Sequence, residues 1–160
     1  MSAAIDINEG GLADLPGVMT VMEAAFEPGF GEGWTASQCA GLLPLPGVWL
    51  TVARIGDHAV GFALARAIAG EAELLLLAVH PDAQGRGIGK SLLNHFFHGA
   101  LTRGADRLHL EVRDGNDAIK LYTMLGFSVV GRRRNYYCGR DGKQYDALSL
   151  AKTAVSSPTE

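Results

Sequence analysis

One segment constrains the fold more than any other. Residues 74–79 are apolar and run directly into a loop with glycine at positions 85, 87 and 89, and a helix-like apolar pattern begins there. Closely spaced glycines let a backbone approach a ligand with its N–H groups exposed. A helix N-terminus adds partial positive charge. The segment therefore predicts a strand, a loop and a helix that together bind an anion, most often a phosphate.

Length and composition fit one compact domain. The chain has 160 residues, of which 48% are hydrophobic, and a formal net charge of −3 with a sequence pI near 5.9. This balance argues against a general nucleic-acid binder. Because no secretion signal or membrane-length apolar run is visible, we expect a cytoplasmic protein without a membrane partner. Cys39 and Cys138 form no metal-binding spacing, so we expect free thiols and no metal.

Apolar periodicity and turn residues predict an order of elements. A strand comes first, then two helices, three strands, a helix, a strand, a helix and two strands, which indicates an α/β domain with a mixed, mostly antiparallel sheet and helices on both faces. The domain is expected over residues 1–151, with 152–160 as a disordered tail. The expected strands are 4–7, 48–55, 59–67, 71–79, 107–113, 127–132 and 145–150, and the expected helices are 14–26, a short one after Thr35, 87–103 and 118–125.

Two of these elements carry patterns that matter for the site. In the strand 107–113, apolar residues alternate with polar ones, which places Glu111 on the polar face. The helix 87–103 is expected to bury a stripe made of Ile88, Leu92, Phe96 and Leu101.

Three phosphate ligands compete for the glycine loop. Residues 89–91 look like the end of a nucleotide P-loop, but that motif needs glycine where this chain has Gln84. A dinucleotide fingerprint needs G-x-G-x-x-G, whereas the spacing here is G-x-G-x-G. A plain strand-to-helix turn rarely needs three glycines and an arginine. The remaining pattern, Q/R-x-x-G-x-G/A, is matched by residues 84–89 at every defined position.

In these residues the chain resembles the GNAT N-acetyltransferases, whose loop of the same form binds the pyrophosphate of CoA. The resemblance implies acetyl-CoA as cosubstrate and the GNAT fold, whose splayed central strand pairs its free backbone with pantetheine. Arg86 and Lys90 would neutralise phosphate charge. The residues expected to bind the cofactor are Leu77, Ala78, Val79, Gln84, Gly85, Arg86, Gly87, Ile88, Gly89, Lys90 and Asn116.

Residues 71–152 resemble, more narrowly, the ribosomal-protein alanine N-acetyltransferases. The matching segments are AVHPDAQGRGIG, LHLEVR, LYTMLGF, RRRNYY and DALSLAK. This implies a peptide or protein N-terminus as acceptor, such as that of a small-subunit ribosomal protein. The N-terminal half matches less well, and Trp34 is its expected contribution to the acceptor side. Tyr136 and Tyr137 would line the acceptor groove or serve only in strand pairing.

Acetyl transfer to an amine needs a proton acceptor and a proton donor. Glu111 matches the glutamate that accepts the proton in the family, and partial burial of a carboxyl moves its pKa toward neutrality. The alternative is a solvated carboxylate paired with Arg113. Tyr122 matches the tyrosine that donates a proton to the CoA thiolate, and the alternative is a core tyrosine. Asn116 and Tyr122 are six residues apart where the family usually has seven.

Other functions stay open at this point. Proteins with this fold also acetylate small amines such as antibiotics, polyamines or amino acids. A further alternative is a protein that binds CoA as a sensor without catalysis. His109 is expected to be a surface or supporting residue, and the arginines 132–134 are expected to be mostly solvated. Since neither cysteine lies in an acceptor motif, direct transfer in a ternary complex is expected.

Overall fold

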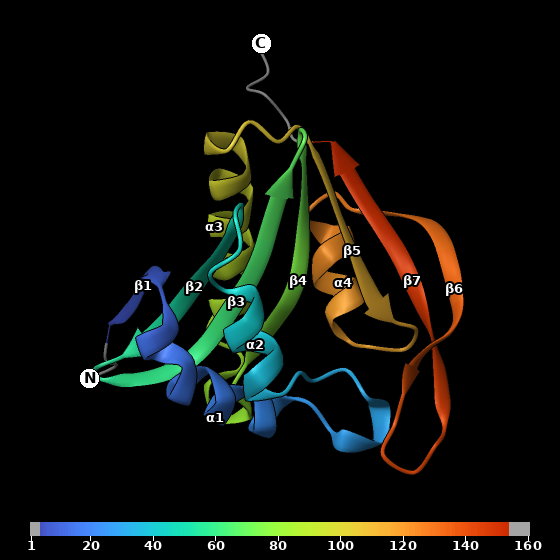
Figure 1. Cartoon of the computed structure of the whole chain (residues 1–160), viewed down its shortest axis with the longest axis horizontal. Helices are drawn as coiled ribbons and strands as arrows, with labels where there is room; N and C mark the ends of the chain where they lie inside the picture. Colours follow the sequence, from blue (N-terminus) through green and yellow to red (C-terminus); the bar gives the residue numbers. More distant parts are fainter. Residues whose placement is uncertain (1–3, 154–160) are drawn as a thin grey trace.

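The computed structural model describes residues 4–153 as a sheet covered by helices on both faces (Figure 1). The strands are β1 Ile5–Gly10, β2 Val48–Ile55, β3 His58–Ile68, β4 Glu71–Val79, β5 Arg107–Arg113, β6 Ser128–Cys138 and β7 Gln144–Thr153. The helices are α1 Leu15–Ala25, α2 Ala36–Leu42, α3 Ile88–Thr102 and α4 Ala118–Met124, with short 3-10 turns at Leu12–Asp14, Pro28–Phe30 and Pro81–Ala83.

The sheet is mixed and mostly antiparallel, as predicted. Its strand order is β1-β2-β3-β4-β5-β7-β6. Among the strands of residues 4–153, only β4 and β5 pair in parallel, and α3 supplies the crossover between them. The α/β fold class, the element order and the β2–β3 hairpin are confirmed.

The two parallel strands separate half-way along. Their last pair joins Leu74 to Leu110, although β4 continues to Val79 and β5 to Arg113. At the same level Leu75 is an extra residue in β4, because Leu64 and Ala65 of β3 pair with Leu76 and Leu74. The expected splayed strand is therefore present, and a β-bulge, which locally bends a strand, marks where it starts.

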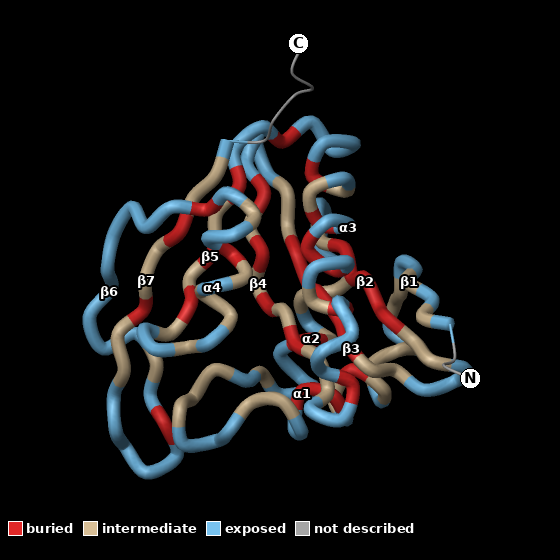
Figure 2. The backbone as a smooth tube through the Cα atoms, turned by 180° about the vertical axis from the view of Figure 1, so that it is seen from behind, coloured by how far each residue is buried: buried red, intermediate tan, exposed pale blue. Residues whose placement is uncertain are grey.

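Helices cover both faces of the sheet. The side chains of α3 and α4 pack on one face in a core that includes Phe96, Leu108 and Tyr122, whereas α1 and α2 pack on the other with Val21 and Phe62. Burial is concentrated in the central strands, while β6 at the edge is exposed along most of its length (Figure 2).

One predicted core position in α3 is wrong. Leu101 is 48% exposed, and Ala100 is buried in its place. Along a helix, a residue five positions after Phe96 points roughly 140° away from it, whereas a residue four positions after it points to nearly the same face. The buried stripe of α3 is therefore Ile88, Leu92, Leu93, Phe96 and Ala100.

The C-terminal hairpin is longer than predicted. β6 reaches Cys138 rather than residue 132, and β7 reaches Thr153, two residues past the expected end of the domain. The expected tail residues 154–160 lie outside the described residues. Between Arg133 and Tyr137 the pairing of β6 is irregular, and Asn135 has a positive φ of 54°. The N–H of Asn135 donates to Oδ1 of Asp146 at 3.0 Å, which supports this irregular turn of the chain.

Candidate active site

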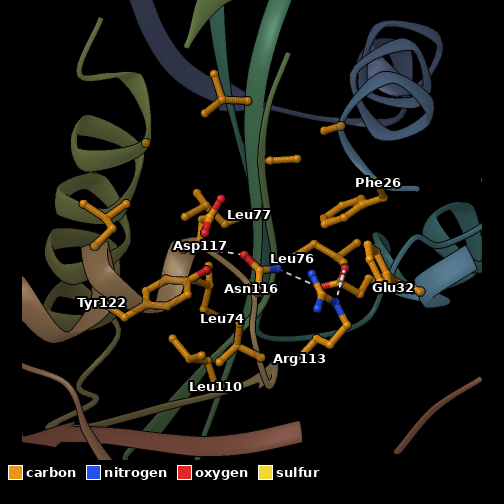
Figure 3. A pocket seen from close by; sticks show the side chains of 18 of the residues that line it. Phe26, Glu32, Leu74, Leu76, Leu77, Leu110, Arg113, Asn116, Asp117 and Tyr122 are labelled. Carbon is orange, nitrogen blue, oxygen red and sulfur yellow. Dashed lines mark hydrogen bonds and ion pairs between the residues drawn. The ribbon is translucent and has the colours of Figure 1, made fainter. Parts of the chain in front are cut away.

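A cleft of 630 Å³ opens where β4 and β5 separate. The ends of these strands, the glycine loop and the start of α4 form its walls, together with residues of the α1–α2 loop and of β6 (Figure 3). Among the residues expected from the sequence to form the site, the following line it: Trp34, Leu77, Ala78, Val79, Gln84, Gly85, Gly87, Ile88, Gly89, Glu111, Asn116, Tyr122, Tyr136 and Tyr137.

The glycine loop presents open backbone to the cleft. Gly85 and Gly87 have φ values of 81° and 76°, and a Cβ added at either position would meet open space. The N–H of Ser91 donates to the carbonyl of Gly87 at 3.0 Å, the first helical bond of α3. The N–H groups of residues 88–90 precede that bond and point out of the helix end. This geometry suits an anion.

Two predicted phosphate ligands lie beside the cleft rather than in its wall. Arg86 and Lys90 are exposed and do not line the cavity. The side chain of Ile88 is only 2% exposed because it packs in the core, so Ile88 can contact a ligand only through its backbone.

The end of β4 offers a second set of backbone groups. Leu77, Ala78 and Val79 pair with β3 on one side and line the cleft on the other. An extended ligand with amide groups could add to this strand edge by backbone hydrogen bonds.

Glu111 lies on β5 just beyond the point of separation. Its side chain is only 13% exposed, and the Ser149 hydroxyl is 2.6 Å from Oε2 and 2.9 Å from Oε1. Nε of Arg133 donates to Oε1 at 2.8 Å. The ion partner of Glu111 is therefore Arg133, and the alternative pairing with Arg113 is wrong. Both donors hold the Glu111 carboxylate in a defined position at the cleft.

Tyr122 lies on α4 and is 5% exposed. Its ring packs edge-on against Phe127, with 5.9 Å between centroids, and its hydroxyl points into the cleft (Figure 3). Burial raises the pKa of the Tyr122 phenol, and the nearby Glu32 carboxylate raises it further. The phenol stays protonated at neutral pH, as a proton donor requires.

Glu32 is a central residue that sequence reasoning missed. It belongs to the glycine-rich loop between α1 and α2, and its side chain is only 9% exposed. Nε of Arg113 donates to Oε1 at 3.0 Å and Nδ2 of Asn116 donates to Oε2 at 2.7 Å (Figure 3). Oδ1 of Asn116 in turn accepts from the N–H of Ala118 at 2.8 Å, in the first turn of α4. The loop is thereby tied to the helix that carries Tyr122.

Aromatic side chains line the other end of the cleft. The Tyr137 hydroxyl donates to the backbone carbonyl of Glu111 at 3.2 Å, and burial, with the charge of Glu32, raises the pKa of Tyr137. Tyr136 packs edge-on against Tyr137 at 4.9 Å but is 48% exposed. Trp34 approaches from the α1–α2 loop.

The α1–α2 loop and the tip of the β6–β7 hairpin meet at this end. A side chain at Gly31 would collide with the backbone carbonyl of Cys138. Near this contact the N–H of Arg140 donates to the carbonyl of Pro28 at 3.1 Å. Two segments more than one hundred residues apart therefore form one wall of the cleft.

His109 lies outside the cleft. It is on the half of β5 that pairs with β4, where Nε2 is 3.5 Å from a carboxylate oxygen of Glu71. Within residues 4–153, no three or more His, Cys, Asp or Glu side chains gather as metal ligands would. No helix in that range is long and apolar enough to cross a membrane.

The comparison with known families agrees with this geometry. A model of the acetyltransferase (GNAT) family matches residues 16–127, which include the splayed strands, the glycine loop and α4. The chain belongs to the GNAT acetyltransferase family. The expected family and its fold are thus confirmed.

Similar proteins with known names or structures include N-acetyltransferases. The [ribosomal protein bS18]-alanine N-acetyltransferase of Salmonella typhimurium is 44% identical over 96 residues, which are 59% of this chain but only 64% of that protein. The crystal structure of the ribosomal-protein-S18-alanine N-acetyltransferase from Escherichia coli superimposes with a TM-score of 0.83 at 30% identity, covering 98% of both chains. The fold of yncA from Salmonella typhimurium, solved with its cofactor acetyl-CoA, gives a TM-score of 0.77 at 19% identity over 99% of this chain and 98% of that one.

Proposed function

We propose that this GNAT protein transfers the acetyl group of acetyl-CoA to the α-amine of a peptide or protein N-terminus. The observation that carries the proposal is the separation of β4 and β5 after Leu74 and Leu110. It opens a cleft that has anion-binding backbone at one end and a half-buried carboxylate with aromatic side chains at the other.

The cofactor end fits the shape and charge of CoA. Acetyl-CoA would supply the electrophilic thioester carbonyl. The N–H groups at the start of α3 and the open backbone at Gly85 and Gly87 suit its pyrophosphate. The edge formed by Leu77, Ala78 and Val79 suits the amides of pantetheine.

Glu111 and Tyr122 supply the proton transfers. The acceptor ammonium must lose one proton before its nitrogen attacks the carbonyl, and Glu111 takes that proton. The C–N bond forms and the C–S bond breaks, and Tyr122 gives its proton to the departing sulfur. Tyr122 regains a proton from the acceptor nitrogen, while Glu111 releases its own to solvent. In total, an ammonium and a thioester become an amide, a thiol and one free proton.

The relatives support a protein N-terminus as acceptor. The relatives from Salmonella typhimurium and Escherichia coli at 44% and 30% identity are named as alanine N-acetyltransferases of ribosomal protein S18. Trp34, Tyr136 and Tyr137 give this cleft an aromatic acceptor end. An α-amine, with a pKa near 8, needs a weaker base than a lysine near 10.4. A ribosomal acceptor would place the reaction in the cytoplasm.

Release of the CoA thiol with a panel of acceptors tests the proposal. The panel contains a peptide with a free N-terminal alanine, the same peptide with a blocked N-terminus and an internal lysine, and a polyamine. We expect rapid thiol release with the first peptide only. Turnover restricted to the polyamine would replace the acceptor by a small amine. Measurable CoA binding without turnover on any acceptor would make the chain a CoA-binding module.

A further inference from the structure

The contact between Arg133 and Glu111 conflicts with the role proposed for Glu111. The guanidinium donates to Oε1 at 2.8 Å, while Ser149 lies 2.6 Å from Oε2. Both carboxylate oxygens therefore already accept hydrogen bonds. An acceptor ammonium needs one of them in order to pass its proton to Glu111.

Oε1 is the oxygen that can be released. Arg133 is 62% exposed and Glu111 13%, so the arginine reaches the carboxylate from the solvent side. Solvent screens an ion pair whose arginine is exposed, so an incoming cation can take the place of the guanidinium. Ser149 lies on the regular β5–β7 ladder, where it pairs with Glu111. The hydroxyl is thus held by the sheet, and the guanidinium is not.

The guanidinium of Arg133 has a second contact besides the carboxylate of Glu111. Regular pairing between β6 and β7 is interrupted from Arg133 to Tyr137. The exposed ring of Tyr136 lies 5.8 Å from the guanidinium carbon, within the range of a cation–π contact. This contact exists together with the bond to the carboxylate, so the guanidinium would keep it when an incoming cation takes its place on Glu111.

We propose that Arg133 occupies the acceptor-amine subsite on Glu111 until the ammonium of the acceptor displaces it, and that it returns when the amide product leaves. This inference rests on the proposed acetyl transfer. An ammonium can take the place of a guanidinium because both are cations that donate N–H bonds to a carboxylate. The product is a neutral amide and cannot compete in the same way. Arg133 is therefore a positioning residue that keeps the carboxylate of Glu111 paired until a charged acceptor takes its place.

The other groups around Glu111 do not take part in this exchange. Ser149 faces it from β7, and the Tyr137 hydroxyl binds its backbone carbonyl rather than its carboxylate. On the loop side, Glu32 is paired with Arg113 on β5, so these two charges offset each other. Arg133 is the cation whose N–H contacts the carboxylate of Glu111 within residues 4–153.

Arg133→Met tests the exchange, with Arg134→Met as a matched control that removes the same charge from the next residue. In Arg133→Met we expect the KM for an N-terminal alanine peptide to fall about fivefold while kcat changes less than threefold. Calorimetry in the presence of CoA should show the same gain for the free peptide and no gain for its N-acetylated form. Arg133→Lys should lie between wild type and Arg133→Met.

Three outcomes would overturn the exchange. An unchanged or raised KM would mean that Arg133 supports Glu111 or binds the acceptor itself. An equal gain in Arg134→Met, or for the acetylated peptide, would mean that only net charge matters. Failure of the proposed function itself would be seen separately, as wild-type protein that binds CoA and acetylates no peptide.

Discussion

The two ends of the cleft are built in different ways. The cofactor end comes from one continuous segment, in which the end of β4 leads through the glycine loop into α3. The acceptor end is assembled from the α1–α2 loop, the end of β5 and the β6–β7 hairpin, and it is held by contacts such as that between Glu32 and Arg113, 81 residues apart. A local motif can therefore form the binding site of the acetyl donor, whereas the binding site of the acceptor depends on tertiary contacts.

The largest expected effect separates chemistry from cofactor binding. Tyr122→Phe keeps the ring that packs on Phe127 and removes only the hydroxyl. We expect kcat to fall by about 100-fold or more, because proton transfer by a positioned group contributes roughly 10²–10⁴-fold. The affinity for acetyl-CoA should stay within about twofold by calorimetry. A normal kcat would make Tyr122 a core residue only.

A second substitution tests the cofactor end alone. Gly87→Val places a branched side chain at a φ of 76°, in the open space above the loop. We expect acetyl-CoA to bind about 30-fold more weakly, because the loop would be strained and its N–H groups covered. Gly56→Val is the matched control, since Gly56 has a φ of 60° in the distant β2–β3 turn. It should lower the melting temperature in the same way and leave the acetyl-CoA affinity unchanged.

A third substitution tests how the acceptor end is held. Glu32→Gln leaves the half-buried guanidinium of Arg113 without its carboxylate partner. We expect a loss of about 2 kcal/mol in the free energy of unfolding, because a hydrogen bond to a charged group contributes roughly 1.5–3 kcal/mol, and a kcat about 10-fold lower. The double variant Glu32→Gln with Arg113→Met should recover part of the stability. Glu27→Gln on the exposed part of the same loop should have little effect on stability, and equal losses in both would argue against the network.

The smallest effect is expected far from both ends. The backbone N–H of Gly11, and then Arg54, lower the pKa of Asp14 below its ordinary value. A lowered pKa in the folded state means that the carboxylate stabilises the fold above about pH 4, and that this contribution is lost as the pH falls through the folded-state pKa. Asp14→Asn should therefore lower the melting temperature by a few degrees at pH 7 and by almost nothing near pH 2. Its kcat should equal that of wild type, and a changed kcat would mean that the β1 edge is coupled to the cleft.

The same contrast explains what the sequence could predict. The elements and the mixed sheet follow from local periodicity and glycine punctuation, whereas the splayed strand follows from the family resemblance carried by residues 84–89. Glu111 and Tyr122 could be assigned because each lies in a short segment with a recognisable pattern. Both residues line the cleft, and Tyr122→Phe and Glu111→Gln test their roles.

Contacts between distant segments were not predictable. Glu32 stands among glycines that indicate only a loop, and nothing local connects it to Arg113 or Asn116. Arg133 belongs to a run of three arginines, which predicts a solvated charge cluster. Nothing local indicates that one of these guanidinium groups donates to Glu111, 22 residues away. The sequence also does not indicate the β-bulge at Leu75, because this residue lies inside a continuous apolar run.

The pH dependence of Glu111→Gln tests the central claim most directly, with wild type and variant compared on the same N-terminal alanine peptide. If Glu111 accepts the proton of the acceptor, kcat/KM should fall by about 100-fold at pH 7. The deficit should shrink steadily toward pH 9.5, where an α-amine with a pKa near 8 has already lost its proton. A loss of the same size at every pH would contradict the account and make Glu111 a structural residue of the cleft.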